Sequence, residues 1–172
     1  MPLYAIDDRE PQIDPSAFIH PDAILIGSVI IGPESSVWPA AVIRGDHGTI
    51  RVGAQTSVQD GAVLHCTAEL DTVIGDRVVI GHCAHLEGCV IGNDALIGSG
   101  AVVLQNARVH DGAMVAAQAL VTMGTSVPSG SVAMGVPAKI RPNSVRSELI
   151  AGAAAVYVHN THWYAASMRR IG

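Results

Sequence analysis

The stretch that decides the fold is residues 91–127, IGNDALIGSGAVVLQNARVHDGAMVAAQALVTMGTSV. Every sixth residue in it is a branched aliphatic, and an alanine follows four positions after most of these. A period of six fits neither an α-helix nor a plain hairpin meander; it is typical of stacked β-helix coils. The aliphatic positions are Ile91, Ile97, Val103, Val109, Val115, Val121 and Val127.

The same repeat extends upstream with three breaks. Three hexads make one coil with three short parallel strands, and successive coils lie about 4.8 Å apart. The pattern therefore predicts an all-β solenoid, a parallel β-helix, with coils from about residue 13 to about residue 135. The upstream aliphatic positions are Ile13, Ile19, Leu25, Ile31, Val37 and Ile43, then Val52, Val58 and Leu64, then Ile74, Ile80 and Leu86.

The composition agrees with a narrow, three-sided prism. Hydrophobic residues make up 49% of the chain but aromatic residues only 3%, as expected of an interior with room for branched aliphatics and alanine and little room for rings. Each coil adds its own share of core, so the chain needs no second domain.

The pattern changes to that of a helix near the C-terminus. We expect residues 1–143 to form the β-helix domain and residues 144–172 a C-terminal α-helix packed on the outside of the prism. Ser144 or Ser147 is the expected N-cap. The residues that fall on one side of this helix are Leu149, Ala153, Val156, Asn160 and Trp163.

Charge and hydropathy exclude several classes. A net charge of −5 argues against a nucleic-acid partner. No apolar run approaches the length of a membrane span, and no basic-then-apolar signal segment opens the chain. We therefore expect no membrane partner and a soluble, cytoplasmic protein in which Cys66, Cys83 and Cys89 are reduced.

The breaks in the repeat locate the polar residues of interest. If Ile13, Ile19 and Leu25 mark faces one, two and three, every break follows a face-three residue. Arg44, His65 and Glu87 each come one residue after a face-three position, so they point outward in a vertical stack. Asp60 and His82 each come two residues after a face-two position, so they stack on a different corner.

These two groups are too far apart to share an ion within one chain. His82 and Glu87 are five residues apart on one strand, roughly 16 Å at about 3.3 Å per residue. The corner of one chain could meet the face of another, in a head-to-tail contact that closes as a threefold ring. The spacing predicts a homotrimer with a metal at each interface.

Five motifs follow one another in order within the hexapeptide repeat: Arg44-Gly45-Asp46, Gln59-Asp60, Leu64-His65, Gly81-His82 and Leu86-Glu87-Gly88-Cys89. These ordered motifs resemble those of the γ-class carbonic anhydrase family over nearly the whole chain. The resemblance implies a left-handed β-helix, a homotrimer and zinc held at the subunit interfaces by three histidines. It implies reversible hydration of carbon dioxide to bicarbonate by hydroxide generated on the metal.

The resemblance also implies roles for single residues, carried over by position. His65 and His82 match two metal ligands, and Tyr157 matches an aromatic residue near the site on the C-terminal helix. Arg44 and Asp46 match an ion pair between subunits. Gln59 and Asp60 match groups that hydrogen-bond the water on the metal.

The third ligand departs from the family pattern, which has a histidine where this chain has Glu87. Glu87 could bind the metal directly, or His85 could bind it while Glu87 supports the ligands. A third alternative is weak metal binding and loss of activity. A carboxylate ligand also makes Fe²⁺ more competitive with Zn²⁺, and Co²⁺ remains a further alternative.

Two other functions remain open at this point. Hexapeptide coils also serve acyltransferases that use coenzyme A or acyl carrier protein, and His82 or His85 could act there as general base without a metal. The other alternative is a catalytically silent siderophore-binding or assembly protein. Stoichiometric metal argues against the acyltransferase, and metal-loaded protein without hydration activity favours the silent protein.

Overall fold

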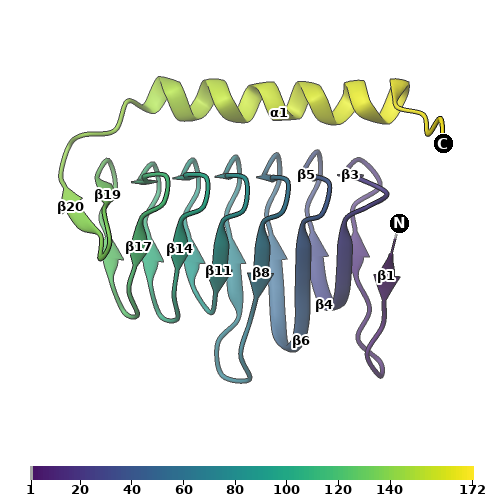
Figure 1. Cartoon of the computed structure of the whole chain (residues 1–172), viewed down its shortest axis with the longest axis horizontal. Helices are drawn as coiled ribbons and strands as arrows, with labels where there is room; N and C mark the ends of the chain where they lie inside the picture. Colours follow the sequence, from purple (N-terminus) through teal and green to yellow (C-terminus); the bar gives the residue numbers. More distant parts are fainter. Residues whose placement is uncertain (1) are drawn as a thin grey trace.

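The computed structural model describes residues 2–172 as a β-solenoid with a single long helix lying along its outside (Figure 1). The predicted all-β solenoid of parallel strands is confirmed. Coils are stacked from the N-terminal end to the C-terminal end of the prism, and the chain then turns back over them as α1 (Ser147–Ser167). No helix in the described part of the chain is long and apolar enough to cross a membrane.

Face two of the prism is an eight-stranded sheet. Its strands are parallel except for the last pair, which is antiparallel. They are β3 (Phe18–Ile19), β5 (Ser36–Val37), β7 (Ser57–Val58), β10 (Val79–Ile80), β13 (Leu96–Ile97), β16 (Met114–Val115), β19 (Val132–Met134) and β20 (Lys139–Arg141).

Faces one and three form a second, twelve-stranded sheet, because two long strands bend from face three onto face one. The long strands are β4 (Ile24–Ile31) and β6 (Val42–Val52). Face three also contains β1 (Leu3–Tyr4), β8 (Val63–His65), β11 (His85–Glu87), β14 (Val102–Val103) and β17 (Leu120–Val121). Face one also contains β2 (Gln12–Ile13), β9 (Thr72–Ile74), β12 (Val90–Ile91), β15 (Arg108–Val109) and β18 (Ser126–Val127).

The predicted aliphatic columns form the core. On face three Leu25 is paired with Ile43, Ile43 with Leu64, and Leu64 with Leu86, and all four side chains are fully buried. Faces one and two have the same register. The alanines that follow four residues later fill the corners between columns and are also buried.

Glycine is required where coils approach closely at the corner that precedes the candidate site residue His82. A Cβ on Gly81 would lie 2.6 Å from the backbone nitrogen of Ser99 in the next coil, a distance that real Cβ atoms essentially never show. The glycine therefore lets the two coils stack at their normal spacing and fixes the corner from which His82 projects.

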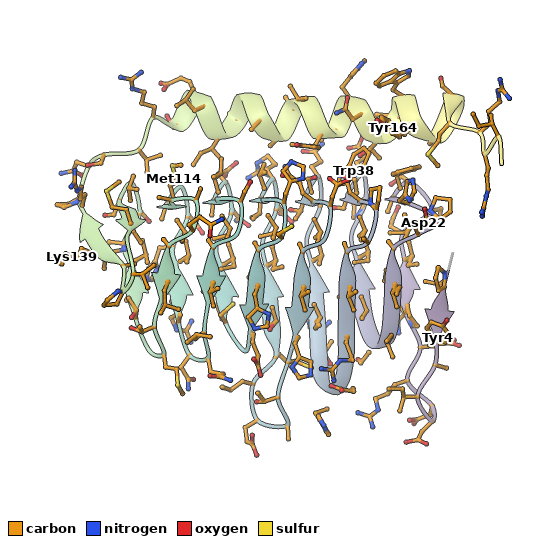
Figure 2. All side chains as sticks on the ribbon, in the orientation of Figure 1. Tyr4, Asp22, Trp38, Met114, Lys139 and Tyr164 are labelled. Atoms are coloured by element: carbon orange, nitrogen blue, oxygen red, sulfur yellow. The ribbon has the colours of Figure 1, made fainter. Side chains whose placement is uncertain are left out.

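Helix α1 covers face two, where it contacts β3, β5, β7 and β10. Figure 2 shows Trp38 beneath the helix and Tyr164 on its underside. Their ring centroids are 4.9 Å apart at an interplanar angle of 90°, and the ring centroid of Tyr157 lies 6.0 Å from that of Trp38. Trp38 is 5% exposed, so these rings form part of the contact between helix and prism, together with the buried Ile150 and Ala154.

The predicted N-cap of the helix is wrong, and which side of the helix packs was not predicted. Leu149, Val156 and Trp163 are 65%, 55% and 55% exposed, whereas Ile150 and Ala154 are buried. The packed side is set by the tyrosines, whose rings reach Trp38. Neither serine is the cap, because the N-cap is Arg146, without a side-chain hydrogen bond.

Candidate functional site

The stack predicted on the outside of face three is present. Arg44 on β6 pairs in register with His65 on β8, and His65 pairs with Glu87 on β11. Each residue follows a buried column residue, so its side chain points away from the core. The solenoid thus aligns a guanidinium, an imidazole and a carboxylate along three successive coils.

Asp46 joins this stack through the bulged middle of β6. Arg44 donates a hydrogen bond to its carboxylate within the same chain, and the Nε2 atom of His65 lies 3.0 Å from Asp46 Oδ1. Burial raises the pKa of Asp46, but the hydrogen bond from His65 and the charge of Arg44 outweigh it and leave this pKa below its usual value. Asp46 therefore stays ionised and fixes the His65 ring.

Glu87 is faced by two imidazoles. Its Oε1 atom is 3.4 Å from His65 Nδ1, and its Oε2 atom is 3.5 Å from His85 Nε2. Neither contact is a hydrogen bond, although all three side chains lie on the outer surface of β8 and β11. Two nitrogens and two oxygens of the type that divalent metals accept are thus gathered here.

The second group lies at the corner between faces two and three. His82 Nδ1 is 2.9 Å from Asp60 Oδ2, and both side chains are about half exposed. This contact leaves the Nε2 atom of His82 available to another partner. The contact lacks hydrogen-bond geometry, but it places Asp60 beside the ring, where outer carboxylates commonly lie next to metal-binding histidines.

Gln59 and Tyr157 border the same corner. Gln59 is 5% exposed and lies beside the Tyr157 hydroxyl, which α1 holds over the prism. Burial and the charge of Asp60 raise the pKa of Tyr157, so the phenol stays protonated at neutral pH. Helix α1 thus places Tyr157 at the corner that carries Gln59 and Asp60, where the resemblance implied an aromatic residue.

The two groups are not brought together within one chain. His65 and Glu87 contact Asp46 and His85, whereas His82 contacts Asp60. Across residues 2–172, no three His, Cys, Asp or Glu side chains are arranged to hold a metal ion by themselves.

The thiols of Cys66 and Cys89 are buried, and burial raises the pKa of Cys89 to about 12.

An outward apolar row on face three was missed in the sequence. These residues precede the column residues and pair with one another in successive coils. The equivalent row of face one is mixed: the exposed Gln12, Arg51, Arg108 and Ser126 share it with Ile30, Val73 and Val90. Comparing these two rows by register would have revealed the difference. The row on face three is Ile24, Val42, Val63, His85, Val102 and Leu120, and we call it the face-three row.

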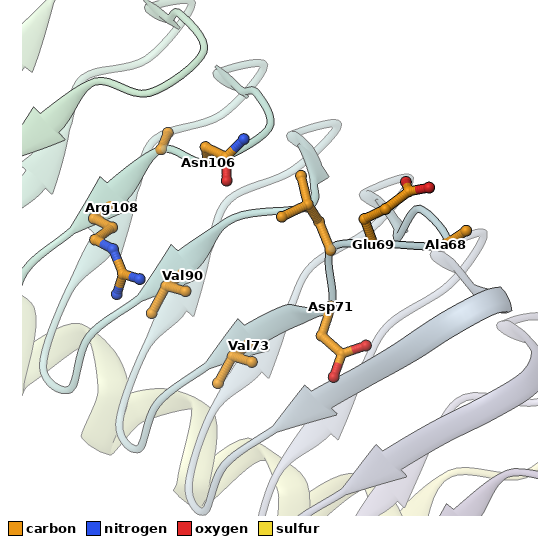
Figure 3. Close-up of a pocket in the computed structure, with 10 residues that line it drawn as sticks. Ala68, Glu69, Asp71, Val73, Val90, Asn106 and Arg108 are labelled. Carbon is orange, nitrogen blue, oxygen red and sulfur yellow. The ribbon is translucent and has the colours of Figure 1, made fainter.

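A cavity of about 360 Å³ lies apart from these histidines, on face one (Figure 3). Val73 and Val90 form its floor, with Asp71 and Glu69 toward one side and Arg108 toward another. None of the candidate ligands lines this cavity.

Known proteins with related sequences carry the same repeat. A family model described as bacterial transferase hexapeptide (six repeats) matches residues 71–105 and 88–122. The carnitine operon protein CaiE of Escherichia coli K12 is 39% identical over 149 residues, which cover 87% of this chain and 76% of that protein. These matches confirm the hexapeptide repeat and support the left-handed coil.

Two solved structures are similar over nearly their whole length. A hexapeptide transferase family protein from Anaplasma phagocytophilum has a TM-score of 0.91 at 37% identity, with 95% of this chain and 98% of that chain covered. A putative acetyltransferase from Bacillus cereus has a TM-score of 0.92 at 34% identity, with 94% and 95% covered. From this coverage and identity, together with the repeat, it follows that the chain belongs to the hexapeptide-repeat family of bacterial transferases.

Proposed function

We propose that this protein is a metal-dependent, γ-class carbonic anhydrase-like enzyme that hydrates carbon dioxide to bicarbonate at the interfaces of a homotrimer. The observation that carries the proposal is the pairing of each candidate histidine with a carboxylate on two separate surfaces of one prism. Asp46 orients His65, and Asp60 orients His82. Each ring keeps its other nitrogen turned toward a place where a ligand could be held.

The donor set fits a divalent metal. His65 and Glu87 of one copy would hold it together with His82 of the neighbouring copy, which makes a two-histidine, one-carboxylate site of a kind that zinc accepts. Such a set also suits Fe²⁺ and Co²⁺, because a carboxylate is a harder ligand than imidazole. Zn²⁺ is the ion that the motif set favours.

The face-three row supports the association of copies. Val63 is 38% exposed in the single chain, and its neighbours in the row are Val42 on one side and His85 on the other. The row lies between the corner with His82 and the edge with His65 and Glu87. A second copy that covers it would remove apolar surface from water, at about 25 cal/mol per Å², and would bring the two groups of donors together.

The chain's own residues then have distinct tasks. When bound, the ion lowers the pKa of a water molecule so that hydroxide is available near neutral pH. Asp46 and Asp60 hold the two imidazoles in place, and Asp60 is also positioned to accept a proton at its half-exposed carboxylate. Gln59, held at the corner beside Tyr157, can orient the attacking oxygen through its side-chain amide.

Metal analysis and stopped-flow hydration assays test this proposal together. We expect about one metal ion per chain in the purified protein, and His65→Ala and His82→Ala should each remove metal and hydration activity. His110→Ala is the matched control, because this exposed histidine bonds Ser126 away from the site. Hydration that persists in metal-free protein, or a monomer with full activity, would contradict the proposal.

An acyltransferase is the second candidate, and the relatives' descriptions favour it. The Bacillus cereus structure is described as a putative acetyltransferase and the matching family as transferases. His82, half exposed and paired with Asp60, has the geometry of a general base fixed by a carboxylate. Thiol release from acetyl coenzyme A by metal-free protein, lost in His82→Ala, would favour this function over hydration.

A further inference from the structure

The face-three row contains one side chain that does not match the others. His85 lies between Val63 and Val102 in the register of successive coils, so an imidazole interrupts an otherwise aliphatic surface. Its side chain is 36% exposed and makes no hydrogen bond within the described residues. In a single chain, water can satisfy its two ring nitrogens.

That exposure ends if a second copy covers the face-three row. An imidazole buried without a partner costs free energy, because it loses its hydrogen bonds to water. The polar group that His85 faces is Glu87 Oε2, at 3.5 Å, and the other oxygen of the same carboxylate faces His65 Nδ1 at 3.4 Å. His85 is therefore directed at the group that would hold the ion.

Three side chains are proposed to hold the ion. His65, Glu87 and the neighbouring copy's His82 leave one position of a four-coordinate ion open, as catalytic zinc sites do. We propose that His85 is an internal fourth ligand that occupies this open position reversibly and competes there with the substrate water. The inference rests on the proposed function and describes the regulation of the same site.

Reversibility follows from the arrangement of the side chains. His65 is held by Asp46, whereas no hydrogen bond within the described residues fixes the His85 ring. No three donors of one described chain are arranged to hold an ion as they stand, so the proposed ligand role requires the His85 ring to turn toward it. A ring without a fixing partner can also turn away, which would give a closed and an open form.

Cobalt and azide test this proposal without measuring turnover. Metal-free protein is loaded with one Co²⁺ per chain, and azide binding is followed by the visible spectrum of the ion. Apparent affinity falls in proportion to the fraction of sites that are open. If His85 closes nine sites in ten, azide should bind His85→Ala about tenfold more tightly than the unaltered protein.

One further variant and one added ligand keep the outcomes separate. His110→Ala should behave like the unaltered protein, and added imidazole should weaken azide binding to His85→Ala by taking the empty place. Equal azide affinity in His85→Ala and the unaltered protein overturns the role of His85 and leaves the proposed function standing. Loss of Co²⁺ from His85→Ala also overturns it, since His85 would then be an essential ligand. If the unaltered protein binds no Co²⁺, both proposals fail.

Discussion

A carboxylate faces each ring nitrogen of His65, and this is the most informative arrangement at the scale of single residues. Asp46 lies 3.0 Å from Nε2 and Glu87 lies 3.4 Å from Nδ1. The lowered pKa of Asp46 keeps one partner anionic at neutral pH. His82 has a comparable but simpler environment, with Asp60 alone at 2.9 Å.

Asp60→Asn tests the orienting role of this second carboxylate. Replacement of a residue that orients a metal-binding histidine commonly weakens metal affinity about 10–100-fold, because the ring loses its fixed tautomer and direction. We expect a loss of this size for Zn²⁺, measured by competition with a chelating dye. Asp94→Asn, on a surface ion pair with Arg77, is the control and should leave affinity unchanged. If Asp60→Asn leaves the affinity for Zn²⁺ unaltered, Asp60 does not orient the His82 ring.

The Arg77–Asp94 pair makes a prediction about pH. Hydrogen bonds from Arg77 at 2.7 and 2.8 Å lower the pKa of Asp94 below its usual value. A carboxyl with a lowered folded-state pKa stabilises the fold above its unfolded pKa, and this stability is lost as pH falls through the folded value. Both side chains are nearly half exposed, so the effect is about 0.2–1 kcal/mol.

Arg77→Ala should raise the pKa of Asp94 toward that of a free aspartate, as followed by NMR titration of the carboxyl carbon. Thermal unfolding should then differ between the variant and the unaltered protein at neutral pH and converge in acid. Arg108→Ala, which removes an exposed arginine from face one, is the control. A pKa of Asp94 that does not move would contradict the assignment of its cause.

At the scale of elements, each strand is too short to be stable alone, and its neighbours in the coils above and below complete it. The two-residue strand β13 is paired with β10 and with β16, and Ile97 is fully buried between Ile80 and Val115. The helix depends on the prism in the same way, because its contact is made by rings that meet Trp38.

Ile97→Ala should lower the free energy of unfolding by about 2–5 kcal/mol, because it leaves a cavity in a column that is closed on both sides. Ile19→Ala, in the same column near its N-terminal end, should cost less, since Ile19 is only partly buried. Chemical denaturation of the two variants measures the difference. Equal losses would show that the column does not pack as a continuous core.

At the scale of the whole molecule, the three faces of the prism differ in what covers them. The helix covers face two, the outward row of face one mixes exposed polar residues with aliphatic ones, and the face-three row is aliphatic except for His85. This asymmetry makes face three the surface where copies would meet.

Val63→Asp should therefore break the assembly. A charge at the centre of the face-three row would be buried without a partner, which is strongly unfavourable. We expect sedimentation velocity to show monomers in place of trimers, with the circular dichroism of the coils retained. Val90→Asp, at the equivalent outward position of face one, is the matched control and should stay trimeric. A trimeric Val63→Asp would exclude this face as the interface.

The sequence by itself determined the coils, the three columns and the direction of the outward residues on the strands, because a period of six on a strand geometry leaves one large inward position per hexad. From that register Arg44, His65 and Glu87 were placed in one stack, and Asp60 beside His82. The tertiary structure decided which side of α1 packs. Tyr157 and Tyr164 contact Trp38, which is far away in the sequence, and no local sequence pattern indicates that contact. The tertiary structure also decided which carboxylates lie beside His65 and His82, because side-chain contacts depend on ring orientation as well as on register.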